Sequence, residues 1–277
     1  MRYLVTGGAG FIGSNTVDEL MRRGHNVVVL DDLSTGKAEN LAGVKGKIEL
    51  LQQDILDLDG LRGACRGVDY VLHLAAQTSV PRSVKDPLET NRVNVDGTLN
   101  VLMAARDARV KRVVFAGSTA VYGDAPGLPK REDMQPAPIS PYGVSKLTAE
   151  IYGEVFHRTY GLEFVSLRYF NVFGPRQDPG SPYSGVLSLF NAAALNGTQP
   201  TIYGDGEQSR DFVYVGNVVE ANLLACEAKG AAGLAINIGT GNRHTLNRTL
   251  ALLEETTGKS VKAKYAPPSA RSVCRPH

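Results

Sequence analysis

The stretch "TGGAGFIG", Thr6–Gly13, gives the strongest indication of the fold of this 277-residue chain. It lies between an apolar segment, "RYLVTG" (residues 2–7), that is typical of a strand and an amphipathic stretch, Phe11–Arg23, that is typical of a helix. Glycines between a strand and a helix permit a tight turn and let backbone amides at the helix N-terminus approach a pyrophosphate. Glycines alone would suit any tight turn, but in this context they predict a dinucleotide-binding loop.

A carboxylate ends the second predicted strand. Asp31 stands eighteen positions after Gly13, where it can accept hydrogen bonds from the adenosine ribose hydroxyls and repel a 2′-phosphate. This position favours NAD over NADP. The alternative is that Asp31 and Asp32 simply begin a solvated loop. Asp54, at the end of the third predicted strand, either meets the adenine edge or serves as a turn residue.

Short apolar segments alternate with amphipathic ones. Near-continuous apolar strands indicate burial on both faces of a sheet, and a repeated order of strand, helix and strand implies right-handed crossovers. The sequence therefore predicts an α/β fold, a doubly wound parallel sheet of the Rossmann type covered by helices. The predicted strands are residues 2–7, 26–31, 47–52, 69–75, 112–118 and 164–172, and the predicted helices include Phe11–Arg23, Pro87–Ala108 and Pro141–Tyr160.

The character of the sequence changes after about residue 172, where a loop rich in proline and glycine begins. We expect an NAD-binding Rossmann domain over residues 1–172 and a smaller C-terminal α/β substrate domain over residues 173–277. The second unit has predicted helices at Val186–Asn196, Asn217–Ala228 and Leu246–Thr257, and short strands near residues 200–206 and 210–215.

Composition and charge exclude several classes of function. The net charge of +2 comes from interspersed acidic and basic residues, so we expect neither a nucleic-acid nor a membrane partner. No apolar run reaches the ~18 residues of a membrane span, and a strand stands where a signal peptide would, which predicts a cytoplasmic protein. Cys65, Cys226 and Cys274 form no disulfide framework or zinc motif, and the first two are expected as buried thiols. The histidines lack metal-ligand spacing, and His73 is expected to be a buried, hydrogen-bonded strand residue.

Three residues further along the chain predict a proton-transfer site. Ser118 ends the predicted strand 112–118, and "SPYGVSK" (residues 140–146) puts Tyr142 and Lys146 on one helix face. Ligands bind outside the carboxyl ends of the strands in such sheets, so the three side chains can border one crevice. An ammonium about 4 Å away at an effective dielectric of ~20 supplies roughly 4 kcal/mol. We therefore expect Lys146 to lower the pKa of Tyr142 toward neutrality; the alternative is a plain helix surface.

Several motifs in order carry a family resemblance: "TGGAGFIG", "HLAA" (73–76), "YGVSK" (142–146), "LRYFNVFGPRQ" (167–177) and "GDGEQSRDFVYV" (204–215). From residue 1 to about residue 268 the chain resembles the extended short-chain dehydrogenase/reductases, and within them the UDP-hexose 4-epimerases. The resemblance implies a catalytic triad of Ser118, Tyr142 and Lys146. Tyr142 would be the base, Lys146 would also bind the nicotinamide ribose, and Ser118 would orient the sugar oxygen. The implied reaction is NAD-dependent inversion at C4 of a UDP-hexose through a 4-keto intermediate.

The resemblance also assigns binding residues. The implied cofactor contacts are Gly7, Gly10, Phe11, Ile12, Gly13, Asp31, Asp54, Ile55, Leu74, Ala75, Ala76, Asn94, Tyr142 and Lys146. The implied substrate contacts are Ser79, Ser118, Thr119, Tyr142, Asn171, Tyr203 and Arg210. An arginine suits a diphosphate because its planar fork binds phosphate oxygens in pairs; alternatively, Arg210 pairs with Asp211 or Glu207. Tyr203 either packs on the uridine or is a core tyrosine.

Related activities are weighed by the residue at position 120. Sugar-nucleotide 4,6-dehydratases and UDP-glucuronate decarboxylases resemble the chain too, but they typically carry an acid there, whereas this chain has Ala120. Because alanine offers no acid or base, the epimerase is favoured. The alternative outside catalysis is an NAD-binding sensor or inactive protein on the same fold. The presence of Ser118, Tyr142 and Lys146 argues for chemistry.

The C-terminal segment departs from the family pattern. "NVFGPRQDP" followed by "GDGEQSRDF" resembles the branch that accepts N-acetylated hexoses, and Ser272 stands where that branch keeps a small residue. After "YAPP" the expected arginine, glycine and aspartate segment is replaced by "SARSVCRPH", which contains Arg271 and Ser272. We expect a truncated or altered end of the substrate pocket, and the choice between N-acetylated and plain hexoses stays open.

The resemblance predicts partners as well. It implies a UDP-sugar as substrate, NAD as cofactor and a homodimer formed through Pro87–Ala108 and the helix that carries Tyr142. No metal is expected.

Overall fold

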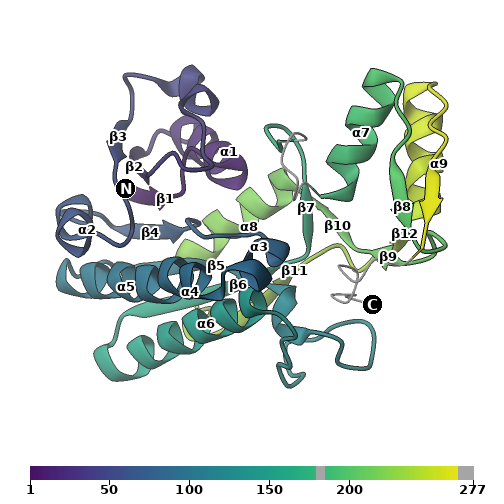
Figure 1. Cartoon of the computed structure of the whole chain (residues 1–277). Helices are drawn as coiled ribbons and strands as arrows, with labels where there is room; N and C mark the ends of the chain where they lie inside the picture. Colours follow the sequence, from purple (N-terminus) through teal and green to yellow (C-terminus); the bar gives the residue numbers. More distant parts are fainter. Residues whose placement is uncertain (179–184, 268–277) are drawn as a thin grey trace.

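A parallel sheet organises the molecule. The computed structural model describes residues 1–178 and 185–267, and within them seven strands pair in the order β11, β6, β5, β4, β1, β2, β3 (Figure 1). These strands are β1 (Arg2–Thr6), β2 (Asn26–Asp31), β3 (Glu49–Gln52), β4 (Tyr70–His73), β5 (Arg112–Ser118), β6 (Glu163–Tyr169) and β11 (Ala235–Ile238). The strand order reverses between β4 and β1, which is the switch point of a doubly wound sheet. The predicted fold class is confirmed.

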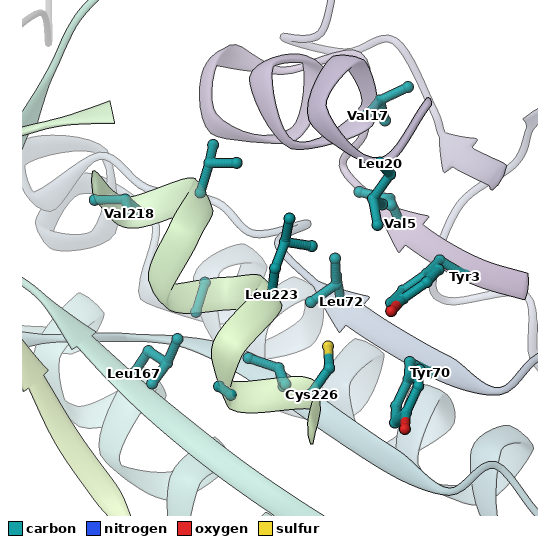
Figure 2. Packing of buried hydrophobic residues seen from close by; sticks show 14 of the residues in the cluster. Tyr3, Val5, Val17, Leu20, Tyr70, Leu72, Leu167, Val218, Leu223 and Cys226 are labelled. Atoms are coloured by element: carbon teal, nitrogen blue, oxygen red, sulfur yellow. The ribbon is translucent and has the colours of Figure 1, made fainter. Parts of the chain in front are cut away.

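Each face of the sheet is covered by helices. Tyr3 and Val5 of β1 belong to one buried cluster and Leu4 to the other, because successive strand side chains point to opposite faces. The helices over the first face are α1 (Phe11–Arg22) and α8 (Val215–Glu227), and those over the second include α2 (Leu58–Ala64), α5 (Gly97–Asp107) and α6 (Pro141–Tyr160). Figure 2 shows Val17 and Leu20 of α1, and Leu223 and Cys226 of α8, turned toward Val5, Leu72, Tyr3 and Tyr70. Burial on both faces explains the apolar strands.

The helix α6 has the predicted bounds, Pro141–Tyr160. Ser140 caps it, since its hydroxyl oxygen accepts a hydrogen bond from the Gly143 N–H at 3.1 Å, and proline suits the first helical position. Gly161 ends it in the left-handed conformation, with φ of +71°. These two ends fix where Tyr142 stands relative to the sheet.

The helix predicted for Pro87–Ala108 is interrupted. The structure has α4 (Pro87–Asn91), a π-helical segment (Arg92–Asp96) and then α5. The extra residue of a π turn changes which side chains face inward, and it leaves Asn94 buried. A short helix α3 (Val80–Lys85) and 3-10 segments at Ala38–Val44 and Thr119–Tyr122 complete this part of the chain.

The predicted strand 164–172 divides in two. After β6, the chain leaves the large sheet and forms β7 (Asn171–Phe173), which pairs in parallel with β10 (Phe212–Tyr214). A smaller unit follows, with β8 (Thr201–Tyr203), β13 (Lys264–Ala266), β9 (Ser209–Arg210), β12 (His244–Thr245), α7 (Val186–Asn196) and α9 (Leu246–Thr257). Its core contains Phe190, Ile202 and Leu250, and Figure 1 shows α7 and α9 together, away from the sheet.

Part of the expected second unit returns to the large sheet. β11 pairs with β6, and α8 packs in the same cluster as α1. The sheet therefore includes residues on both sides of the boundary expected at residue 172, because the apolar face of a helix does not say which sheet it covers.

The remaining predictions on composition concern cysteines, membranes and metals. Cys65 and Cys226 are buried free thiols, as expected, whereas Cys274, Arg271 and Ser272 lie outside the described residues. Within residues 1–178 and 185–267, no helix is long and apolar enough to cross a membrane. Over the same ranges, no group of histidine, cysteine and acidic side chains is arranged to hold a metal ion.

Candidate active site

The glycine loop is shaped by close backbone contacts. Gly7 has φ of +67°, and a Cβ on it would lie 2.7 Å from the backbone nitrogen of Ala75. A Cβ on Gly13 would lie 2.1 Å from the Gly7 carbonyl oxygen. Both positions therefore require glycine, and they hold the start of α1 against the end of β1.

The N-terminus of α1 is suited to an anion. Its N-cap is Gly10, and no side chain among the described residues caps it. The first turn begins with Phe11, Ile12 and Gly13 and carries no acidic residue. Its N–H groups and the positive end of the helix dipole are thus available to a pyrophosphate, so the residues present fit a dinucleotide.

Asp31 closes the same loop from the end of β2. Its carboxylate accepts hydrogen bonds from the N–H groups of Ala9 and Leu33, each at 2.9 Å. The residue is buried, and burial raises its pKa. Asp32, in contrast, is exposed and accepts from Ser34. Asp32 is therefore the residue that begins a solvated loop, which was the alternative for this pair. Each oxygen of Asp31 still has a lone pair that can accept a hydrogen bond from a ligand hydroxyl.

The other expected cofactor contacts surround this loop. Leu74 and Ala75 follow β4 and donate their N–H groups to the backbone and side-chain oxygens of Thr6, at 3.2 and 3.3 Å. Ala76 continues the same segment. Ile55 is buried against Gly97. Asp54 is exposed and accepts from the Leu56 N–H at 2.9 Å, which is the turn role given as its alternative.

The triad residues meet at the carboxyl end of β5. Ser118 ends the strand, and its hydroxyl hydrogen bonds with the phenol of Tyr142, the second residue of α6. Lys146, one turn later, is buried. Its ammonium donates to the Ala116 carbonyl oxygen at 2.9 Å and lies 4.8 Å from the centre of the Phe115 ring. Because Lys146 is buried and Tyr142 bonds with Ser118, the two residues are not the plain helix surface that was the alternative.

The electrostatics of the pair differ from the expectation. Burial raises the pKa of Tyr142, and the hydrogen bond with Ser118 opposes this rise. Burial also lowers the pKa of Lys146 from 10.5 to about 7. The expectation that Lys146 lowers the pKa of Tyr142 is therefore wrong for the protein by itself. The reason is that low polarity penalises both charged forms, so the ammonium loses much of its charge near neutral pH.

Three of the expected substrate contacts, Ser118, Thr119 and Asn171, lie near the carboxyl ends of β5 and β6. Ser118 is opposite Tyr169 in the sheet register, and the Thr119 hydroxyl donates to the Tyr169 carbonyl oxygen at 3.3 Å. Two residues on, Asn171 donates its side-chain amide to the Asp211 carbonyl oxygen at 3.0 Å. Ser79 is buried and caps α3 by accepting from the Arg82 N–H at 3.0 Å.

Arg210 and Tyr203 differ in their settings. Arg210 is half-buried, and burial lowers its pKa. Its guanidinium donates to the Ser209 carbonyl oxygen at 2.8 Å. The Asp211 carboxylate accepts from the N–H groups of Thr240 and Gly241, and the Glu207 carboxylate accepts from Asn247. Tyr203 is 51% exposed, which excludes the core alternative.

Sequence reasoning missed a buried ion pair behind the triad. Arg168 of β6 and Glu150 of α6 form an ion pair at 2.6 Å, and Glu150 also accepts from the Ser166 hydroxyl. Arg168 further donates to the phenol oxygen of Tyr122 at 2.7 Å. A signal was present, because Tyr142, Lys146 and Glu150 repeat every four residues along one helix face and Arg168 interrupts an apolar strand.

A second missed feature joins the segment after β7 to the glycine loop and its helix. The Asn15 amide donates to the Pro175 carbonyl oxygen at 3.1 Å, and Arg176 pairs with Asp18. Lys37 pairs with Asp178 at 2.9 Å.

Comparisons with known proteins agree with this geometry. Residues 3–239 match the model of a family described as the NAD dependent epimerase/dehydratase family. The chain is 42% identical over 273 residues to a UDP-glucose 4-epimerase of Mycolicibacterium smegmatis, covering 97% of this chain and 86% of the relative.

Two solved structures are similar throughout. One is a UDP-glucose 4-epimerase of Thermus thermophilus in complex with NAD, with a TM-score of 0.88 and 43% identity over 100% of this chain and 88% of that one. The other is a UDP-N-acetylglucosamine 4-epimerase of Methanobrevibacter ruminantium M1 in complex with UDP-N-acetylmuramic acid, with a TM-score of 0.93 and 42% identity over 97% and 86% of the two chains.

Proposed function

Because the chain belongs to the NAD dependent epimerase/dehydratase family, we propose that it inverts the C4 configuration of a UDP-hexose through a 4-keto intermediate. The substrate is the UDP-glucose and UDP-galactose pair or its N-acetylated counterpart. The observation that carries this proposal is the junction of Ser118, Tyr142 and Lys146 at the edge of the sheet that also bears the glycine loop. The chemistry that bound NAD supplies is the acceptance of a hydride from C4 and its return.

The residues that would hold NAD are those of the glycine loop and its neighbours. The N–H groups at the start of α1 would bind the pyrophosphate, and Asp31 would accept hydrogen bonds from the adenosine ribose hydroxyls. The ion pairs of Lys37 and Arg176 join the segment after β7 to this side of the site. An epimerase must keep NAD bound throughout its cycle, because the same cofactor is reduced and then restored.

Tyr142 takes the proton of the C4 hydroxyl and later gives it back. Its place in the first turn of α6 favours the phenolate, since the helix dipole stabilises negative charge there. Ser118 donates a hydrogen bond that orients the sugar oxygen. Lys146 donates to the Ala116 carbonyl oxygen, which keeps its amine inside the protein. From there the amine would bind the nicotinamide ribose.

Alternative activities are weaker on this chain. A dehydratase must also remove a proton at C5, and Ala120 supplies no group for it. A sensor or inactive NAD-binding protein has no need of a buried lysine one turn after a tyrosine that hydrogen bonds with a strand-end serine.

The nucleotide end of the substrate is assigned to Asn171 and Arg210. Both residues flank Asp211, and Asn171 is hydrogen-bonded to its backbone. Arg210 would bind the diphosphate, since desolvation of a guanidinium strengthens its pairing with phosphate oxygens. Relatives that act on plain and on N-acetylated hexoses are equally similar to this chain, so the proposed substrate class covers both.

A second copy of the chain is the proposed protein partner. Leu88 of α4 is 82% exposed, and three apolar residues of α6, Val144, Ile151 and Val155, are also exposed. Such a row on adjoining helices favours a homodimer through α4 and α6. A cytoplasmic location likewise stays a prediction.

The experiment is a product assay. Purified protein is incubated separately with UDP-glucose and UDP-N-acetylglucosamine, and the C4 epimers are resolved by chromatography. The proposal expects the galactose or galactosamine epimer from at least one substrate. Formation of neither epimer would overturn it, and a 4-keto-6-deoxy product would support the dehydratase.

A further inference from the structure

A buried line of polar side chains leads from the glycine loop into α5. Thr6 Oγ1 lies 2.7 Å from His73 Nδ1, and His73 Nε2 lies 3.0 Å from Thr98 Oγ1. The Thr98 hydroxyl in turn donates to the Asn94 carbonyl oxygen at 2.6 Å. All four residues are at most 2% exposed, so water does not compete for these bonds.

The hydrogen-bond directions along this line are fixed. A carbonyl oxygen has no hydrogen to give, so the single hydroxyl hydrogen of Thr98 points to Asn94, and Thr98 accepts from His73 Nε2. A neutral imidazole with its hydrogen on Nε2 accepts at Nδ1, so Thr6 donates there. The Thr6 oxygen then accepts the N–H of Ala75, at 3.3 Å. Each group has one consistent role.

The imidazole is held neutral, as this pattern requires. Burial lowers the pKa of His73 to about 3, and the nearby ammonium of Lys146 acts in the same direction. A histidine cation would carry a hydrogen on Nδ1 as well, so Thr6 could no longer donate its hydroxyl hydrogen to the ring.

The line continues from Asn94 to the catalytic helix. The Asn94 side-chain amide donates to Ser145 Oγ at 3.0 Å, and Ser145 donates to the carbonyl oxygen of Tyr142 at 2.8 Å. Asn94 also clamps the backbone of Gln77, accepting from its N–H at 2.8 Å and donating to its oxygen at 3.0 Å. Asn94 makes these bonds from within the π-helical segment Arg92–Asp96.

We propose that His73 and Thr98 are positioning residues that couple the cofactor loop to the backbone of the tyrosine base. Through a series of five hydrogen bonds, of which the first four are buried and the last is part-buried, they join Thr6, next to Gly7, to the first turn of α6. The network sets the placement of Tyr142 relative to a dinucleotide held by the loop. This inference rests on the proposed function, because the placement matters for turnover only if Tyr142 transfers a proton to or from a bound sugar.

The size of the expected effect follows from geometry. Displacing a reacting group by about 1 Å costs up to a hundredfold in rate, whereas binding contacts elsewhere are unchanged. Disrupting the network should therefore lower kcat and leave the KM for the UDP-sugar close to its original value.

Thr98 offers a matched pair of variants. Thr98→Val removes both its donor and its acceptor and keeps the volume, whereas Thr98→Ser keeps the hydroxyl. As a control, Thr256 of α9 makes the same hydroxyl bond to the carbonyl four residues earlier, at 2.7 Å, but is exposed. We expect Thr98→Val to lower kcat about tenfold or more with NAD retained, Thr98→Ser to restore most of it, and Thr256→Val to change nothing.

Amide hydrogen exchange gives a readout that does not depend on activity. In Thr98→Val we expect faster exchange, by about tenfold, both at residues 7–13 and in the first turn of α6, and near-original rates in Thr98→Ser.

The proposal is overturned if Thr98→Val retains full kcat, if both Thr98 variants lose it equally, or if exchange changes only near position 98. Should Thr98→Val fail to fold, Ser145→Ala tests the far link with the same measurements. If the unmodified protein shows no epimerase activity, the proposed function is contradicted. The exchange rates of the Thr98 variants still test the hydrogen-bond network in that case.

Discussion

The ammonium of Lys146 and the carbonyl oxygen of Ala116 lie 2.9 Å apart, inside the protein. This hydrogen bond ties α6, the helix that carries Tyr142, to β5, two residues before Ser118. It also keeps the amine inside the protein. Burial there lowers the pKa of Lys146 to about 7. Burying this lysine therefore lowers the stability of the folded protein at neutral pH, and the loss can be measured.

Replacing Lys146 should stabilise the protein without NAD. The pKa of Lys146 is about 7 in the folded state and 10.5 ordinarily, so between these values the unfolded chain binds more protons than the folded one. Burial of Lys146 therefore lowers the free energy of unfolding, by the full amount below about pH 7 and by less and less as the pH rises toward 10. We expect Lys146→Met to raise the unfolding free energy at pH 7 by about 1 kcal/mol or more and to abolish turnover.

Urea unfolding at pH 7 and pH 9 checks this prediction. The stability difference between Lys146→Met and the original protein should shrink at the higher pH. Lys111→Met is the control, since Lys111 is an exposed partner of Asp69, and its replacement should leave stability close to that of the original protein at both pH values. A Lys146→Met variant that is less stable at both pH values would contradict the prediction.

The ion pair of Arg168 and Glu150 should be costly to break from one side. Both side chains are buried, so Glu150→Gln leaves a guanidinium without a counter-charge. We expect the unfolding free energy to fall by about 3–5 kcal/mol. The exposed pair of Arg131 and Asp133 is the control, and Asp133→Asn should leave the unfolding free energy nearly unchanged. Equal losses in the two variants, measured by urea unfolding, would show that burial does not set the cost.

Asp31 should decide the choice of cofactor. Asp31→Asn removes the charge that repels a 2′-phosphate while keeping the shape of the side chain. We expect the ratio of NAD affinity to NADP affinity to fall about tenfold or more, measured by calorimetric titration of protein freed of nucleotide. Asp32→Asn is the matched control because Asp32 is exposed and accepts from Ser34 instead of the glycine loop. An unchanged ratio in Asp31→Asn would place cofactor selection elsewhere.

Local signals in the sequence predicted much of the fold. β2, β5, α6, α7 and α9 have the predicted bounds. In α6 this follows from a serine cap, a proline at the first position and a glycine at the end. By contrast, the apolar pattern of α8 could not say which sheet it covers. The sequence places this helix in the second unit, but Leu223 and Cys226 lie in the cluster of β1 and β4 (Figure 2).

The site shows the same limit. The spacing of Tyr142 and Lys146 predicted their shared face, but the sign of the pKa shift depends on burial, which spacing does not report. Glu150 and Arg168 are 18 positions apart along the chain, and only the packing of α6 on β6 brings them together. No local signal marked the π turn that interrupts Pro87–Ala108, within which Asn94 bonds with Gln77 and Ser145.

In the proposed mechanism, inversion at C4 depends above all on the phenol of Tyr142 as the carrier of the proton. The rate of epimer formation by Tyr142→Phe, with bound NAD quantified in the same sample, measures this dependence. We expect full retention of NAD and a loss of turnover of about 10²–10⁴-fold, because the ring stays in place and the proton acceptor is gone. Turnover within a factor of two of the original protein would contradict the proposed role and move the base to another residue.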